Sequence, residues 1–394
     1  MSRNRRAARG DTRTVITARG PADLVAAVPY LVGFVPSSSV VLISLRGPRL
    51  RFGLVARLDL PDVGSEVEAA RAISEMIRRD GPREVVVLVY DDAGWRPDRR
   101  PHQSLVDAVG AELAGHDIAL RDAIYVTPQR FWSISCPDDA CCPDAGWALR
   151  DAISSPVAAT YVLHGRAPLP DRRALSDRVA PLGPIMLAAV GAAADTAVDA
   201  IGPSWGDERS LPLLSWQRAS VALFDELARR YAGGARDLSV SEAGRLIAGL
   251  ADTAVRDVVA TRWTRWWQAL PDSGAPDDEM ARHTGHLSAG PVGVDLEDPA
   301  VTEGVEQLFV DLARRGQGPQ VLGPLTVLAM HSWALGNGAF AGVAIDRALS
   351  IDPAYRMAGL VDTLLRAGLA PRWVAAVRAA DERLPPRRPS QGMR

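Results

Sequence analysis

All three cysteines of the chain fall within seven residues, at Cys136, Cys141 and Cys142. Thiolates bind zinc, but a closed zinc site needs four ligands, so a residue from elsewhere in the fold would have to complete it (His102, His116 or Asp138). The same spacing permits a redox pair of Cys136 with Cys141, or a tight loop whose small thiols only pack. Zinc binding, redox activity and packing therefore all remain open, and zinc is the one cofactor that the sequence suggests.

A second chemical feature is the pair Asp91 and Asp92, which follows the apolar run EVVVLVY at residues 84–90. A strand this apolar is typical of the centre of a sheet covered on both faces. Ligands bind at the carboxyl ends of strands in open α/β sheets, where a carboxylate can act as a base or hold a divalent ion. Asp91 and Asp92 are therefore the catalytic candidates, although aspartates followed by Gly94 more often simply start a turn.

The elements that would position these residues form a sheet-containing half over residues 15–165. Residues 40–45 and 54–60 predict a hairpin, the capping-box pattern of Ser65 and Glu68 predicts a helix after it, and residues 103–114 predict another helix. Two further strands are expected near residues 118–127 and 130–135. The fold class is α/β, with a mixed sheet of about five strands in the order β-β-α-β-α-β-β.

Helical periodicity replaces the strand pattern after residue 165, which predicts an all-α half over residues 166–384. Trp263, Trp266 and Trp267 have the spacing of a core-facing helical stripe. A long loop is expected at residues 271–299, where glycine, proline and acidic residues interrupt the pattern. Residues 325–367 resemble one tetratricopeptide-like helix pair, which needs neighbouring helices to bury its apolar face.

Composition excludes several classes of function. The chain has no lysine, so its 45 basic residues are all arginine, and phosphate-binding loops and Schiff-base chemistry that require a lysine are excluded. The formal net charge of -2 predicts no general attraction to nucleic acid. No apolar stretch is long enough to span a membrane, and no secretory signal follows the basic residues 1–14. We expect a cytoplasmic protein with disordered tails at residues 1–14 and 385–394.

Four segments together resemble one family of proteins, the actinobacterial domain of unknown function 4192. They are RGPADLVAAVPYLVGFVPSSSVVLISLRG (19–47), EVVVLVYDD (84–92), CPDDACCPDAG (136–146) and ALSIDPAY (348–355). The resemblance covers nearly the whole chain and implies an actinobacterial, cytoplasmic protein, but it supplies no activity.

The functional expectation is therefore a non-enzymatic interaction or regulatory protein with a protein partner on its helical half. The alternative is an enzyme, or a protein that binds a small ligand or metal, with its site near Asp91 and the loop 136–142. An interaction protein should show an exposed apolar groove on its helices. An enzyme should show a pocket where Asp91 and the cysteine loop meet.

Overall fold

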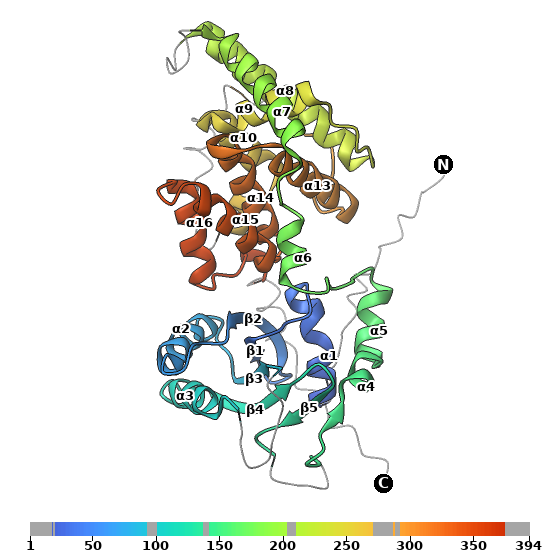
Figure 1. Cartoon of the computed structure of the whole chain (residues 1–394), viewed down its shortest axis with the longest axis vertical. Coiled ribbons are helices and arrows are strands. Elements are labelled where there is room, and N and C mark those ends of the chain that lie inside the picture. The colour runs from blue at the N-terminus through green and yellow to red at the C-terminus, as the bar shows by residue number, and fades with distance from the viewer. Residues whose placement is uncertain are drawn as a thin grey trace, which may run out of the picture.

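The computed structural model divides into a sheet half and a helical half, one above the other in Figure 1. It describes residues 18, 20–92, 101–136, 142–202, 210–270, 287 and 292–374. The expected tails and most of the expected loop at 271–299 lie outside these residues. Within the described chain, no helix combines the length and the apolar character needed to cross a membrane.

The sheet half contains one mixed sheet of six strands in the order β2-β1-β3-β4-β5-β6. Only β3 and β4 pair in parallel; the other neighbours are antiparallel. The strands are β1 (Ser39–Arg46), β2 (Arg51–Asp59), β3 (Glu84–Tyr90), β4 (Ala119–Val126), β5 (Arg130–Ser133) and β6 (Trp147–Ala148). The predicted α/β class is confirmed; the sixth strand, with two residues, is too short to leave a pattern in the sequence.

Helices cover both faces of this sheet. On one face lie α2 (Glu66–Arg78) and α3 (Gln103–Ala114), and on the other lie α1 (Pro21–Val32), α4 (Leu149–Ile153) and α5 (Pro156–Leu163) (Figure 1). Side chains alternate along β3, so Val85 and Val87 join the core under α2 and α3, while Val86 and Leu88 join the core under α1. The expectation that residues 84–90 form a strand buried on both faces is confirmed.

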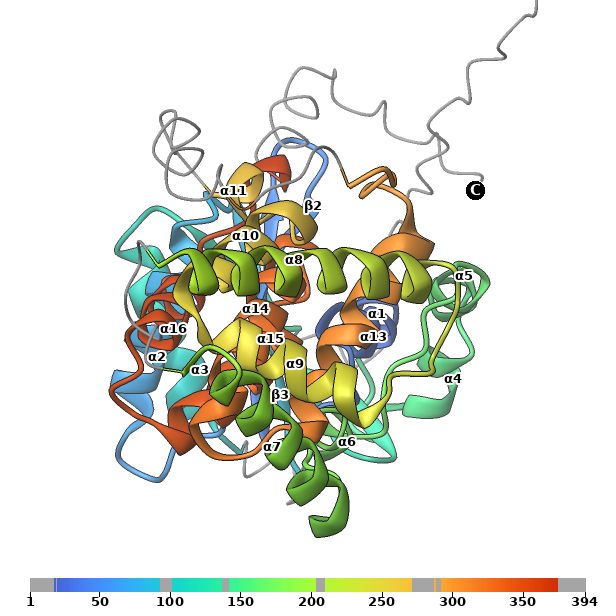
Figure 2. The same ribbon diagram turned by 90° about the horizontal axis from the view of Figure 1, so that it is seen from above.

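The chain enters the helical half between α5 and α6. The helical elements there are α6 (Arg172–Asp177), α7 (Pro184–Asp199), α8 (Leu211–Ala232), α9 (Val240–Ala251), α10 (Thr253–Trp263), α11 (Trp266–Ala269), α13 (Pro299–Arg315), the 3-10 turn η2 (Gly318–Val321), α14 (Leu322–Ala334), α15 (Gly338–Ile351) and α16 (Arg356–Arg366). From above, α8 crosses over the other helices (Figure 2).

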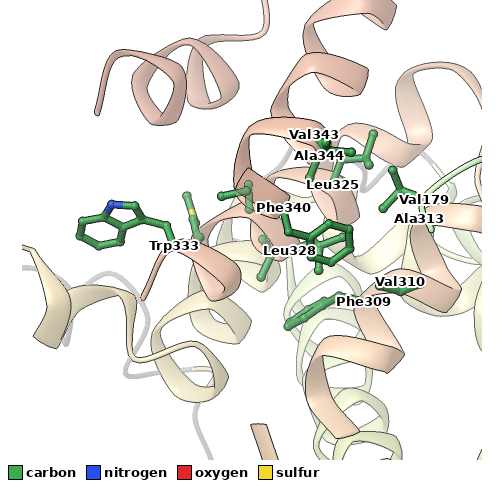
Figure 3. Packing of buried hydrophobic residues seen from close by; sticks show 14 of the residues in the cluster. Val179, Phe309, Val310, Ala313, Leu325, Leu328, Trp333, Phe340, Val343 and Ala344 are labelled. Carbon is green, nitrogen blue, oxygen red and sulfur yellow. The ribbon is translucent and has the colours of Figure 1, made fainter. Parts of the chain in front are cut away.

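Helix α14 lies at the centre of this half, because every one of its residues is buried. Phe309 from α13, Leu328 from α14 and Phe340 from α15 point toward one another (Figure 3). Trp263 and Trp266 are also buried, but they do not share one helix as the spacing predicted. Helix α10 ends at Trp263, Arg265 has a left-handed φ of 52°, and Trp266 begins α11; the side chain of Trp267 is outside the described part. Helices are thus found across the segment expected to form a tetratricopeptide-like pair.

Candidate functional site

A cleft of about 1770 Å³ separates the two halves of the molecule. Its sheet-side wall is formed mainly by β2, which is the sheet edge nearest the helical half in Figure 1. Its opposite wall is formed by the end of α14, the start of α15 and the segment 368–374 that follows α16. The halves also touch directly, since Gly368 packs against Met76 and Leu54, and Arg79 Nη1 donates to the Ala367 carbonyl over 3.3 Å.

Strand β2 presents its outer backbone edge toward this cleft. Among the described residues it pairs with β1 alone, and the Leu60 N–H donates to the Ser38 carbonyl directly opposite. Bonding alternates along an antiparallel pair, so the register places the N–H and C=O groups of Val55 and Arg57 on the side away from β1. Both residues line the cleft.

Seven arginines line the cleft, against one carboxylate among the described lining residues, Asp122. They come from separate segments of both halves: Arg46, Arg49, Arg51, Arg57, Arg121, Arg166 and Arg172. At least four of them have an ion-pair partner just outside the lining: Asp80 for Arg46, Asp59 for Arg57, Glu84 for Arg121, and Asp346 for Arg172. These pairs reduce the field, but each guanidinium carries five N–H donors, so donors remain for an anion.

Arg46 is held by a buried carboxylate behind the wall. Asp80 accepts hydrogen bonds from Ser44 Oγ (2.6 Å) and from the Leu54 N–H (2.9 Å), and Arg46 Nε lies 3.0 Å from the same oxygen as an ion pair without hydrogen-bond geometry. The pairing of β1 with β2 shifts register at this point. Gly53 makes the arrangement possible, because a Cβ atom there would lie 2.0 Å from Asp80 Oδ2.

Arg57 on β2 is also held in place, by a serine hydroxyl and an aromatic ring. Its Nε and Nη2 donate to Ser39 Oγ (2.9 and 2.6 Å), and its guanidinium lies over the ring of Phe34. Burial lowers the pKa of Arg57; Asp59 opposes this shift, and the positive charge of Arg172 adds to it. The like charges of Arg57 and Arg172 repel each other, and a bound anion would reduce that repulsion.

The helical wall is apolar and partly exposed. Leu335, Leu369 and Trp373 are 36%, 39% and 42% exposed. The Trp373 indole is anchored, because its Nε1 donates to the Ala334 carbonyl over 2.8 Å and its ring lies 3.3 Å from where a Cβ atom of Gly336 would stand. Gly336 has a left-handed φ of 83°, which also favours glycine. The wall is thus a preformed apolar surface.

Asp91, a predicted site residue, lies elsewhere, at the carboxyl end of β3. Its Oδ2 is 2.9 Å from His102 Nε2 and accepts a hydrogen bond from the Tyr125 hydroxyl over 3.1 Å. His102 has a left-handed φ of 57°, uncommon for a residue other than glycine. Burial, and then the charge of Asp91, raise the pKa of Tyr125. Asp92 is exposed, and neither aspartate lines the cleft.

The cysteine segment does not converge on Asp91 in the described structure. The Asp91 N–H donates to the Val126 carbonyl at the carboxyl end of β4. Strand β5 runs antiparallel to β4, so Cys136, which follows β5, lies toward the opposite end of β4. Cys136 and Cys142 are half-buried, and Cys141 lies outside the described residues. No group of three or more histidine, cysteine or acidic side chains suited to a metal occurs in the part of the chain that the structure describes.

The arginine cleft was not predicted from the sequence. Its arginines are spread over residues 46–172 and meet only in the folded chain, so they form no local motif. One signal was present: Arg57 and Asp59 alternate with apolar residues on a strand, which predicted a hairpin with one wet face.

In a comparison with known families, a profile of the family described as "Domain of unknown function (DUF4192)" matches residues 21–372. No curated protein and no solved structure matches the chain.

Proposed function

Because the chain belongs to the DUF4192 family, whose description assigns no activity, we propose a function from the geometry. The chain is a non-enzymatic interaction protein, and the cleft between its halves binds an acidic stretch of a partner protein. The observation that carries this proposal is the wall of seven arginines around one large cleft.

The size of the cleft favours a macromolecular partner over a small substrate. Sites for small molecules commonly enclose about 300–1000 Å³. The cleft measures about 1770 Å³ and is open between the two halves, which is more space than a metabolite fills. Helices α14 and α15, the expected tetratricopeptide-like pair, supply part of one wall, in keeping with the use of such hairpins in protein binding.

The origin of the arginines supports a binding role over simple protection of the sheet edge. Charged side chains on an edge strand discourage unwanted strand pairing, and this would account for Arg51 and Arg57. It does not account for Arg166 and Arg172, which lie beyond the sheet and face the same cleft.

The proposal is tested with a fluorescent ten-residue oligoglutamate and fluorescence anisotropy. We expect the wild type to bind this probe, and the double variant Arg51→Glu, Arg166→Glu to bind it at least tenfold more weakly. Arg150→Glu is the matched control, because Arg150 is 88% exposed and outside the cleft. Equal affinity of all three proteins, or no binding at all, would rule the proposal out.

A second candidate function is favoured by the contacts of Asp91. A carboxylate that holds a histidine ring is a common arrangement for general-base catalysis, and here Asp91 contacts both His102 and Tyr125. The cysteines 136, 141 and 142 stay proposed zinc ligands as a separate site, because their segment does not converge on Asp91. Metal analysis of purified protein tests that part: stoichiometric zinc that is lost in Cys136→Ser would support it, and three titratable thiols without zinc would remove it.

The actinobacterial source and the cytoplasmic location implied by the resemblance remain predictions. Fractionation of the source cells would test the location, and recovery of the protein in the membrane or extracellular fraction would contradict it.

A further inference from the structure

The two walls of the cleft differ in chemistry. The β2 wall carries Arg51 and Arg57, and Arg166 also lines the cleft, whereas the helical wall carries Leu335, Leu369 and Trp373. A ligand with carboxylates on every side would place some of them against the apolar helical wall. Those carboxylates would lose water without gaining a partner, which is unfavourable. The cleft therefore complements a ligand with one acidic side and one apolar side.

We infer that the occupant of the cleft is an amphipathic acidic segment of a partner protein, with its carboxylates on the β2 wall and its apolar side chains on Leu335, Leu369 and Trp373. This inference rests on the proposed function and specifies the partner more narrowly. An α-helix has a diameter of about 10–12 Å and rises 1.5 Å per residue, so each residue fills about 120–170 Å³. A cleft of about 1770 Å³ then holds a segment of about 10–15 residues.

Charge argues against the chain's own termini as the occupant. Residues 1–14 contain five arginines and one acidic residue, and residues 385–394 contain three arginines and no acidic residue. Both would meet the arginine wall with charge of the same sign, which is unfavourable. A partner with acidic residues has the complementary charge.

The apolar wall also argues against a single-stranded nucleic acid. Such ligands stack their bases on aromatic platforms in a basic groove. Two of the three exposed apolar side chains here, Leu335 and Leu369, are aliphatic and offer no ring for stacking, whereas an aliphatic wall matches leucine-type side chains of a peptide.

The test uses two labelled 14-residue peptides of identical composition, seven glutamates and seven leucines. In one peptide the leucines fall on a single helical face, and in the other they are scrambled so that no face is apolar. We expect the patterned peptide to bind full-length protein at least tenfold more tightly than the scrambled one. Trp373→Ala should remove about tenfold of that preference. A tenfold change is about 1.4 kcal/mol, which corresponds to covering about 55 Å² of apolar surface, a part of the 42% of Trp373 that is still exposed.

Control variants separate this inference from the proposed function. Ile185→Ser is the matched apolar control, because Ile185 is 86% exposed on α7 and lies outside the cleft. Leu369→Ser is a second test on the wall itself, in case Trp373→Ala unfolds, and thermal melts confirm that each variant is folded.

Each result has one meaning. Tighter binding of the patterned peptide that both Leu369→Ser and Arg51→Glu weaken supports the inference. Equal binding of the two peptides, weakened by Arg51→Glu alone, refutes the amphipathic segment and leaves the acidic-partner function standing. Binding of neither peptide, preferential binding of a 15-nucleotide oligothymidine, or concentration-dependent dimerisation through the same residues refutes both.

Discussion

Replacing Gly53 with alanine should destabilise the sheet half strongly, because the new methyl group enters the Asp80 network. A Cβ atom there would lie 2.0 Å from Asp80 Oδ2, 2.5 Å from Arg46 Nε and 2.8 Å from Ser44 Oγ. Carbon atoms do not approach polar atoms so closely, so the carboxylate must leave its donors. Hydrogen bonds to a charged group contribute about 1.5–3 kcal/mol each, and a buried charge left without partners costs about 3–5 kcal/mol. We expect a loss of about 3–5 kcal/mol in the free energy of unfolding.

Urea denaturation followed by circular dichroism measures this loss. Gly359→Ala in α16 is the control, since a Cβ atom there meets nothing within 4 Å and the substitution should stabilise the helix by up to about 1 kcal/mol. A double-mutant cycle identifies the cause: in an Asp80→Ala background the clash with the carboxylate is absent, so Gly53→Ala should cost much less. A cost below about 1 kcal/mol, or the same cost in both backgrounds, would refute the reasoning.

Three further predictions concern the helical half. Asp225→Ala should lower the free energy of unfolding by about 3–5 kcal/mol in urea denaturation, because it removes the acceptor of the buried Trp263 N–H and breaks the buried ion pair with Arg262; a loss under about 1 kcal/mol would contradict this. Gly323→Ala should cost about 1–3 kcal/mol, since its Cβ atom would lie 2.1 Å from the Leu250 carbonyl oxygen where α9 meets α14; an unchanged thermal midpoint would contradict this close contact. Burial lowers the pKa of His331 below its ordinary value of 6.5, while Glu306 opposes the shift, so the unfolded chain takes up a proton more readily. The stability from this group should be fully present above about pH 6.5 and fall as the pH drops below it. In denaturation curves at about pH 5–7.5, His331→Gln should make the free energy of unfolding depend less on pH. An equal pH dependence in both proteins would be the contrary result.

The sheet half was predictable because its signals are local. The continuous apolar run at 84–90 predicts a buried strand, and the alternation of apolar and charged residues within 40–60 predicts a hairpin. The structure has both. The two-residue strand β6 and the short helices α4 and α6 have too few residues for a period, so they appear only when the whole chain folds.

The cleft was beyond sequence reasoning for a different reason. Arg51 and Arg166 are far apart in the chain, and each alone has the character of an ordinary surface residue. They meet because the helical half packs against the sheet half, where Gly368 contacts Leu54 on β2 and Met76 on α2. By contrast, Asp91 was predictable as a candidate site residue because it follows directly after a strand, which is a local feature. In the structure it contacts His102 and Tyr125.

Hydrogen exchange of the full chain, with and without the patterned acidic peptide, tests the central claim most directly. The account predicts slower exchange in both walls of the cleft, at residues 51–57 and 368–374, and no change in α7, which lies outside the cleft. Protection confined to one wall, or protection near residues 91–102 with none at β2, would contradict the claim that the cleft is the binding surface.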